Sequence, residues 1–212
     1  MSNDYRNTKY CPNLDGLAAK KEAIKDAVLK AHPRAKDMHT YISNNEMSFK
    51  RQFVQAYNGK CAYCGVSVDI ISLRLFEIDH LVPKESARFG GSKAKAGRIE
   101  NLVAACSYCN RNKSSFECTD EDLSKINPDT TEILESFFRD NMYYIKISNG
   151  RKNDNIVRAF YEKVGLGCQV HRIDYLLMNM RGVCDKMASN KNSLGLLREA
   201  IDLLQRKRNK MW

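Results

Sequence analysis

Apolar residues in the first quarter of the chain recur at helical spacing. Between residues 14 and 31 they appear every three or four positions, and this pattern ends before Pro33. A second run with the same spacing extends from about Ser48 to Tyr57, where Asn58-Gly59 ends it. The pattern predicts two helices, the second of which packs beneath the segment that follows.

The middle of the chain has a strand-like pattern instead. Residues 66–78 are rich in β-prone side chains, which predicts a strand or hairpin, and residues 102–105 form a short apolar strand. Between them, residues 88–98 contain three glycines and several basic residues, a composition typical of a flexible loop. We expect the second strand to lead into a helix.

Helical spacing returns beyond Pro128. We expect helices over residues 131–141, 153–164, 169–188 and 193–208, with a short β-prone run at 143–147. No stretch of eighteen apolar residues and no N-terminal hydrophobic segment is present, so we expect a cytoplasmic protein without a membrane partner. The fold class expected is α+β. Its parts are an N-terminal helical arm (1–57), a compact middle domain (58–116) and a mainly helical C-terminal domain (117–212).

The formal net charge of +10 is unevenly distributed. Residues 79–113 carry seven Lys or Arg against three Asp or Glu, whereas residues 114–140 carry two against eight. Residues 141–212 are again basic, with fourteen against six. Two basic regions suit a polyanionic partner, but ordinary solvated lysines give the same counts, so charge alone leaves both interpretations open.

Four of the eight cysteines form two Cys-x-x-Cys pairs, Cys61 with Cys64 and Cys106 with Cys109. The other four are scattered, which is typical of a reducing compartment. Two such pairs offer four thiolates to a structural zinc ion with tetrahedral geometry. The gap of forty-one residues between the pairs exceeds that of simple zinc ribbons, so we expect a functional unit inserted there.

Residues suited to hydrolytic chemistry lie between the cysteine pairs and directly after them. Hydrolysis of a phosphodiester needs a base for the attacking water and compensation of the charge that develops on the phosphate. His80 is the candidate base, because a neutral imidazole near pH 7 can accept a proton. Asp79 and the side-chain oxygen of Asn110 form a hard oxygen donor set that suits Mg²⁺ or Mn²⁺.

Asp79 and His80 are consecutive, and consecutive strand residues face opposite ways. They can converge only where the strand ends or bulges, and Pro83 agrees with an end at this point. Strand alternation could place Glu77, two positions before Asp79, near the metal, but we expect it to face solvent. Three further histidines have no chemical context in the sequence and are expected to be surface or packing residues, namely His32, His39 and His171.

The order of these residues resembles the HNH (ββα-metal) endonuclease family. That family has a His preceded by an acid or His, then an Asn, then a final His or Asn, often braced by two Cys-x-x-Cys pairs. This chain supplies Asp79-His80, Asn101 and Asn110. The runs Tyr-Asn-Gly-Lys-Cys-Ala-Tyr-Cys-Gly and Glu-Asn-Leu-Val-Ala-Ala-Cys also look like cysteine-bearing members. The chain departs from the family's name at the last position, where Asn110 replaces His.

The resemblance implies a small ββα-metal core braced by a zinc site of four cysteines. It implies an endonuclease that cleaves DNA with one Mg²⁺ or Mn²⁺ ion and leaves 5′-phosphate and 3′-hydroxyl ends. His80 would be the general base, Asp79 and Asn110 the metal ligands, and Asn101 a residue whose amide fixes the loop at His80. Contacts with backbone phosphates are expected from Lys84, Arg88, Lys93, Lys95, Arg98, Arg111 and Lys113.

DNA is the expected partner, while the sequence leaves RNA, the oligomeric state and any activating partner open. Compact HNH proteins with extra helical regions include effectors of bacterial anti-phage defence, some working beside an ATPase, which makes such an ATPase a candidate partner. Two other classes of function stay open: a zinc-ribbon module that binds nucleic acid without catalysis, and a structural subunit of a larger complex. Both keep the four cysteines and make Asp79, His80 and Asn110 dispensable.

Overall fold

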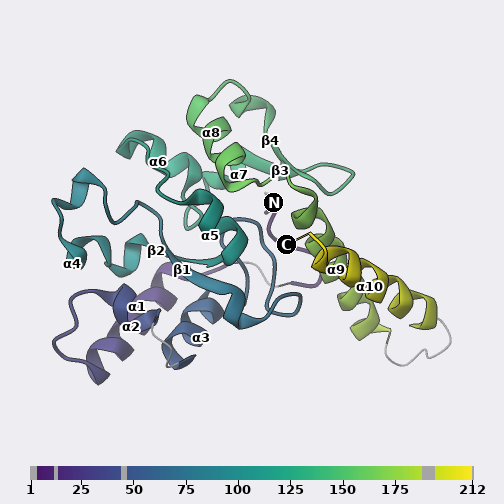
Figure 1. The fold of residues 1–212 in the computed structure, drawn as a ribbon, viewed down its shortest axis with the longest axis horizontal. Coiled ribbons are helices and arrows are strands. Elements are labelled where there is room, and N and C mark those ends of the chain that lie inside the picture. Colours follow the sequence, from purple (N-terminus) through teal and green to yellow (C-terminus); the bar gives the residue numbers. More distant parts are fainter. Residues whose placement is uncertain (1–3, 12–13, 44–46, 188–193, 212) are drawn as a thin grey trace.

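The computed structural model describes residues 4–11, 14–43, 47–187 and 194–211. At its centre, β1 (Phe76–His80) pairs antiparallel with β2 (Leu102–Cys106), and His80 lies opposite Leu102. Every residue of β2 is buried, so this strand is covered on both faces. The helix α5 (Ser107–Lys113) follows β2 without a loop and packs against both strands (Figure 1).

Three helices form the N-terminal arm. They are α1 (Leu17–Ala31), α2 (Met38–Ile42) and α3 (Met47–Ala56). Figure 1 shows them grouped on the side of the β1–β2 sheet away from α5. A buried lysine of α1 fixes the arm, because the Lys21 ammonium donates to the Leu102 carbonyl at 2.8 Å and to the Asp129 carboxylate at 2.6 Å.

The segment between β1 and β2 contains short helical turns, α4 (Lys93–Ala96) and 3₁₀ turns at Ala87–Phe89 and Ile99–Asn101. Ser92 caps α4, its hydroxyl accepting from the backbone N–H of Lys95. The expectation of an irregular loop here is therefore only partly right, because capping hydroxyls turn the chain into helical pieces around the glycines.

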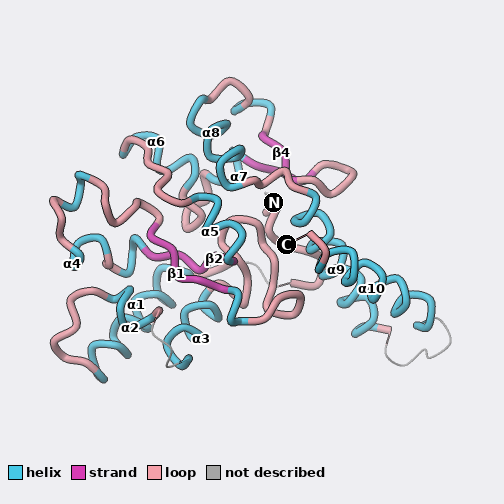
Figure 2. Tube along the Cα trace, viewed as in Figure 1, coloured by secondary structure: helices cyan, strands magenta, loops and turns pink. Residues whose placement is uncertain are grey.

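The C-terminal part begins with small elements and ends with long helices (Figure 2). The elements are α6 (Asp120–Ile126), α7 (Ile133–Ser136), β3 (Phe137–Arg139), β4 (Ile145–Ile147), α8 (Asn155–Val164), α9 (Gln169–Lys186) and α10 (Leu194–Asn209). In Figure 1, α9 and α10 lie side by side and project from the rest of the molecule. A buried ion pair between Asp174 and Arg208, 2.6 Å long, joins these two helices.

Two expectations about these elements were wrong. The strand expected over residues 66–78 is present only from Phe76, as β1, since the residues before it form turns, an isolated bridge between Ser67 and Lys60, and a 3₁₀ turn at Leu73–Leu75. Residues 131–141 form α7 and then β3, because Phe137 pairs with Ile147 across an antiparallel hairpin. The helices α2 and α6 were not expected. Positions 188 and 193, which the sequence assigned to helices, lie outside the described residues, as does Trp212.

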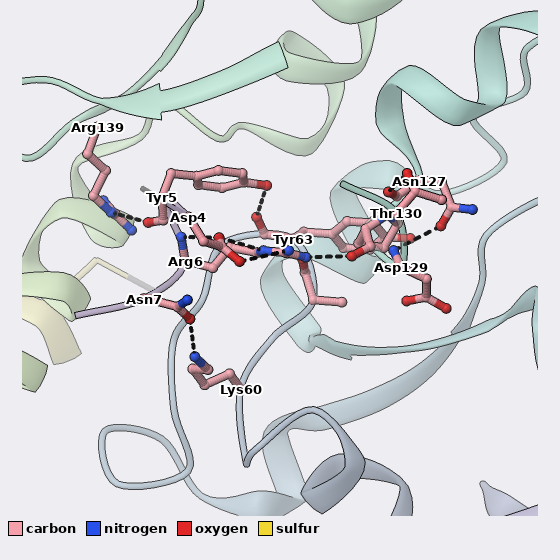
Figure 3. Close-up of polar contacts among 12 residues, drawn as sticks. Asp4, Tyr5, Arg6, Asn7, Lys60, Tyr63, Asn127, Asp129, Thr130 and Arg139 are labelled. Atoms are coloured by element: carbon pink, nitrogen blue, oxygen red, sulfur yellow. Dashed lines mark hydrogen bonds and ion pairs between the residues drawn. The ribbon is translucent and has the colours of Figure 1, made fainter. Parts of the chain in front are cut away.

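Tyr5 and Arg6 contact the turn that carries the first cysteine pair, and Figure 3 shows them beside Tyr63 of that turn. The Tyr5 hydroxyl donates to the Tyr63 carbonyl at 2.8 Å, and the buried Arg6 guanidinium donates to the Ala62 and Pro128 carbonyls at 3.1 and 2.7 Å. Gly65 permits this approach. Its φ is +82°, and a Cβ at this position would lie 2.5 Å from the Arg6 carbonyl oxygen.

The expected α+β class is confirmed: two small antiparallel sheets are embedded among helices, and the four paired cysteines lie beside β2. Buried apolar side chains from all three expected parts of the chain contribute to the core. No helix in the described part of the chain is long and apolar enough to span a membrane.

Candidate active site

The four paired cysteines converge on one point. Their sulfur atoms all lie within 4.8 Å of one another and are buried, with Cys64 Sγ and Cys106 Sγ 3.9 Å apart. Zinc–sulfur bonds of about 2.3 Å in a tetrahedron place the sulfurs about 3.8 Å apart. The donor atoms, their spacing and their burial fit a structural zinc ion, as the sequence predicted.

The first pair lies in a turn in which three carbonyl groups accept hydrogen bonds from distant side chains. Arg6, Tyr5 and Arg139 donate to the carbonyl oxygens of Ala62, Tyr63 and Cys64 respectively. Because each buried carbonyl requires a donor, these three contacts fix the turn to Tyr5 and Arg6 on one side and to β3 on the other.

The second pair lies where β2 becomes α5. Cys106 is the last residue of β2 and caps the helix, with its sulfur 3.5 Å from the backbone nitrogen of Cys109. The Nε2 atom of His171, on α9, lies 3.8 Å from Cys109 Sγ, and this histidine is only 2% exposed. His171 was expected to be a surface or packing residue. It packs directly against the cysteine cluster, a position that no sequence pattern indicated.

β1 presents two residues to α5. Glu77 and Asp79 lie two positions apart on one face of the strand, and Asn110 and Lys113 lie one turn apart on the helix. The two spacings match, so Glu77 meets Asn110 and Asp79 meets Lys113.

Asp79 is held as a buried carboxylate. It accepts from the Tyr63 hydroxyl at 2.5 Å and forms an ion pair with Lys113 at 3.0 Å, and the two charged side chains are 7% and 1% exposed. Burial raises the pKa of Asp79, and the Lys113 charge and the Tyr63 hydrogen bond oppose that rise.

Lys113 was expected to contact phosphates, and that expectation is wrong. Its ammonium is buried and bonds Asp79 and the His80 carbonyl, the latter at 2.8 Å. A side chain in this position cannot reach the backbone of a bound nucleic acid. Instead it joins the end of β1 to α5.

Asn110 has a fixed orientation. Its Nδ2 atom donates to Glu77 Oε2 at 2.6 Å, and Glu77 also pairs with Arg111 at 3.1 Å. Because an ionised carboxylate only accepts hydrogen bonds, the amide nitrogen of Asn110 must face Glu77 and its oxygen must face away. Glu77 was expected to face solvent, but it is half-buried and its carboxylate sets the direction of the Asn110 amide.

His80 is the last residue of β1, and its ring is half-buried. Burial lowers the pKa of His80 to about 4, and repulsion from the nearby His39 and from Lys84 and Lys113 adds to this effect. The imidazole is therefore neutral at pH 7. The protonation state needed for a base is present without any further group.

Asn101 bridges the two ends of the segment between the strands. Its amide nitrogen donates to the Val82 and Ala96 carbonyls at 3.0 and 2.9 Å, and its side-chain oxygen accepts from the backbone N–H of Val82 at 2.8 Å. These bonds hold the chain directly after His80, at the position where the resemblance placed a loop-fixing amide.

The end of β1 opens into a cavity of about 360 Å³. Asp79, His80 and Asn110 all line it, together with His39, Pro83, Lys84, Glu85 and two serines of the chain after α5. Alternation places Asp79 and His80 on opposite faces of β1, and they share one cavity because the strand ends at His80.

The expected phosphate-binding residues have different environments. Lys84, Lys93, Lys95, Arg98 and Arg111 are exposed. Arg88 is half-buried, donates to the Cys118 carbonyl and pairs with Asp120 at 2.9 Å, so its charge is already neutralised. A second groove, of about 680 Å³, is lined by Arg88, Lys95 and Arg98 and by Leu81 and Val82 next to His80.

Comparisons with known proteins agree with this geometry. Residues 61–116 match the family model described as HNH endonuclease. The chain is similar to the CRISPR-associated endonuclease Cas9 of Streptococcus mutans serotype c, with 29% identity over 154 residues that cover 72% of this chain and 10% of that protein. It is also similar to the Cas9 of Corynebacterium diphtheriae, with 34% identity over 67 residues that cover 32% of this chain and 5% of that protein. No solved structure matches the chain at a significant level.

The chain spans a small fraction of the length of these relatives, so the likeness concerns a domain. The matched segment begins at Cys61 and ends just after α5, and it includes β1, β2, the four cysteines and the cavity residues from Asp79 to Asn110. Residues 61–116 therefore form a domain of the HNH endonuclease family.

Proposed function

We propose that this protein is a metal-dependent endonuclease that hydrolyses phosphodiester bonds in DNA. His80 is the general base, and Asp79 and Asn110 hold one Mg²⁺ or Mn²⁺ ion. The observation that carries the proposal is the shared cavity at the end of β1, where a neutral imidazole, a carboxylate and an oriented amide oxygen lie together.

In the proposed reaction, Nε2 or Nδ1 of His80 takes a proton from a water molecule whose oxygen attacks the phosphorus atom. The bond from phosphorus to the 3′ oxygen breaks, and the leaving 3′ oxygen takes a proton from solvent water, which leaves a 5′-phosphate and a 3′-hydroxyl. The low pKa of His80 keeps the ring free to accept this proton at neutral pH. Asn101 keeps the base in place through its bonds to the backbone of Val82.

The chemistry of the donors fits a hard divalent cation. The Asn110 amide oxygen points away from Glu77 and has no hydrogen bond in the part of the chain that the structure describes. Asp79 Oδ1 accepts one bond, from Lys113, and so keeps a lone pair for a cation. When bound, such an ion compensates the negative charge that develops on the phosphate oxygens. Oxygen donors favour Mg²⁺ or Mn²⁺ over zinc, whereas the four thiolates favour zinc.

We assign the phosphate contacts to the exposed basic residues around the cavity and the adjoining groove. Lys84 lines the cavity, and Lys95 and Arg98 line the groove beside residues 81 and 82. Contacts of this kind position a nucleic acid without reading its sequence. DNA is the proposed substrate because the Cas9 relatives carry the name endonuclease and because this surface is basic.

One observation favours a second function, a zinc-ribbon module that binds nucleic acid without cleaving it. The Asp79 carboxylate is nearly buried and already paired with Lys113, which is also what a purely structural aspartate would do. In that case His80 would be dispensable and the basic surface alone would matter. Cleavage and binding must therefore be measured together.

The test is cleavage of supercoiled plasmid by the full chain with Mg²⁺ or Mn²⁺, comparing wild type with His80→Ala. A gel shift on the same DNA and a zinc determination are run in parallel. The proposal expects nicking or cutting by wild type and a loss of at least about a hundredfold in His80→Ala, since general base catalysis contributes about 10²–10⁴-fold. Binding and zinc content should stay unchanged.

Equal cleavage by both proteins would reject His80 as the base. Binding without cleavage by wild type, on DNA and on RNA and with either ion, would favour the binding module.

Because the relatives are CRISPR-associated, we further propose a role in defence against phage, with an ATPase as a candidate partner. Plating of phage on cells that express wild type or His80→Ala tests this role, and equal plating would reject it.

A further inference from the structure

The structure raises the question of what orients the base. A catalytic histidine is commonly oriented by a hydrogen bond from its second ring nitrogen to a third group. Among the residues that the structure describes, none forms a hydrogen bond with either ring nitrogen of His80. Asn101 holds the backbone after His80 but does not touch the ring. The orientation of the imidazole must come from packing.

The packing partner is His39, on α2. The rings of His39 and His80 have their centroids 4.3 Å apart and their planes inclined at 31°, which is a close, tilted contact of two aromatic rings. His39 lies forty-one positions earlier in the chain and outside the segment that matches the HNH family. It lines the same cavity as His80. The N-terminal arm thus contributes directly to the wall of the site.

His39 is itself fixed to the strand that carries the base. Its Nε2 atom lies 3.0 Å from the carbonyl oxygen of Ile78, two residues before His80. A carbonyl oxygen only accepts, so Nε2 of His39 carries the hydrogen. This bond occupies Nε2, and the other ring nitrogen, Nδ1, lies 3.5 Å from the Ser43 hydroxyl, so both ring nitrogens face protein atoms. His39 therefore suits a positioning role better than a catalytic one.

We propose that His39 is a positioning residue that sets the ring plane of His80 by stacking, while its hydrogen bond to Ile78 keeps the two rings in register. The proposal rests on the function proposed for His80. It makes the N-terminal arm part of the active site, because α2 supplies the surface on which the base packs.

Three substitutions separate the contact of the His39 ring with His80 from its hydrogen bond to Ile78. His39→Ala removes the ring and the hydrogen bond. His39→Phe keeps a ring and loses the hydrogen bond. His39→Gln keeps a donor for the Ile78 carbonyl and loses the ring. The matched control is His32→Ala, because His32 lies on the same arm and stacks on Tyr41 with centroids 4.6 Å apart, away from His80.

The measurements are kcat and KM for plasmid cleavage, the melting temperature, and the ring-proton NMR signals of His80. Only four histidines are present, so single substitutions suffice to assign these signals. We expect His39→Ala and His39→Gln to lower kcat by about ten- to a hundredfold at unchanged KM, the effect of misplacing a reacting group by about 1 Å. The kcat of His39→Phe should stay within about threefold of the wild-type kcat. This is a smaller loss than the tenfold or greater loss expected from a misplaced reacting group.

The NMR signals report on the stack independently of activity. Loss of the His39 ring current should move the His80 ring signals downfield in the Ala and Gln variants and leave them upfield in the Phe variant. His39→Gln separates positioning from a structural role, because it keeps the anchor to β1. A fall in kcat in this variant without a fall in melting temperature is the expected result.

Cleavage by His39→Gln at the wild-type kcat would overturn the proposal. The proposal would also be overturned if His39→Phe lost as much kcat as His39→Ala and its melting temperature fell equally. The hydrogen bond to Ile78, and not the ring contact, would then be the contact that matters. If the wild-type protein cleaves no DNA, the proposed function fails. The NMR signals of the His80 ring then still test its contact with His39. Unchanged His80 signals in His39→Ala would reject it.

Discussion

At the scale of single residues, Asp79 and Lys113 show how burial assigns a role. A surface lysine next to a metal-binding motif is well placed for a phosphate, but Lys113 is 1% exposed and bonds a carboxylate that is itself nearly buried. A buried charge without its partner is costly, so each of these residues requires the other.

Replacing Lys113 with Met should destabilise the protein by roughly 3–5 kcal/mol, because it leaves the Asp79 carboxylate buried and unpaired. Urea unfolding of the zinc-loaded protein measures this effect. The double variant Lys113→Met/Asp79→Leu should recover part of the loss, since two apolar side chains leave no unpaired charge. A single variant as stable as wild type, with weakened DNA binding, would instead return Lys113 to the phosphate-binding set.

The sequence identified the chemistry of several site residues but not their neighbours. The motif singled out His80, Asp79 and Asn110 because an imidazole and two oxygen donors at this spacing suit hydrolysis. Glu77 and His39 were assigned to the surface or to packing. Glu77 contacts Asn110 only because strand and helix spacings coincide, and the position of His39 beside His80 depends on how α2 packs on β1.

At the scale of elements, the two cysteine turns join the β-sheet to the rest of the fold. Cys106 ends β2 and begins α5, and the turn at Cys61 and Cys64 is held by Arg6 and Arg139. Loss of one thiolate should therefore loosen the sheet and α5 together.

Cys61→Ser should lose the bound zinc and lower stability by several kcal/mol, because structural zinc contributes an apparent 10–16 kcal/mol or so of binding energy to folding at neutral pH. Zinc content by elemental analysis and a thermal melt check this. Cys168→Ser is the control, since Cys168 is an exposed cysteine outside the cluster, and it should keep both zinc and melting temperature. Chelation of zinc from wild type should reproduce the Cys61→Ser result.

Prediction of elements succeeded where one side of a long helix is apolar. The spacing anticipated α8, α9 and α10 to within a few residues, because their buried faces repeat over several turns. It failed at residues 131–141, where a four-residue helix gives way to β3. A strand of three residues has no period to detect, and its partner β4 lies several residues further along the chain.

At the scale of the whole molecule, the uneven charge has two different uses. Several acidic residues of the segment 114–140 form ion pairs within the protein. Asp120 pairs with Arg88, Asp122 with Lys125 and Asp129 with Lys21. The lysines and arginines of the segment between β1 and β2 are mostly exposed instead. We therefore expect the binding of nucleic acid to depend on that basic segment.

Replacing Lys93, Lys95 and Arg98 together with Ala should weaken DNA binding and flatten its dependence on salt. Each lost phosphate contact lowers the slope of log K against log salt by about 0.9, so the triple variant should lose roughly 2–3. Fluorescence anisotropy across a salt series measures the slope. The control replaces Lys30, Arg34 and Lys36 of the N-terminal arm, with the same change in net charge. Equal slopes in both variants would show that only net charge matters.

The sequence by itself predicted the cluster of four cysteines, the resemblance of residues 61–116 to HNH endonucleases, the α+β class and the long C-terminal helices. Cys-x-x-Cys doublets, an Asp-His-Asn-Asn order and helical spacing are local patterns, and local chemistry specifies them. Tertiary structure decided which side chains surround that motif. Lys113 forms a buried ion pair with Asp79, Glu77 contacts Asn110, and His39 lies against His80, because each contact joins elements whose packing depends on the whole core rather than on the residues beside it.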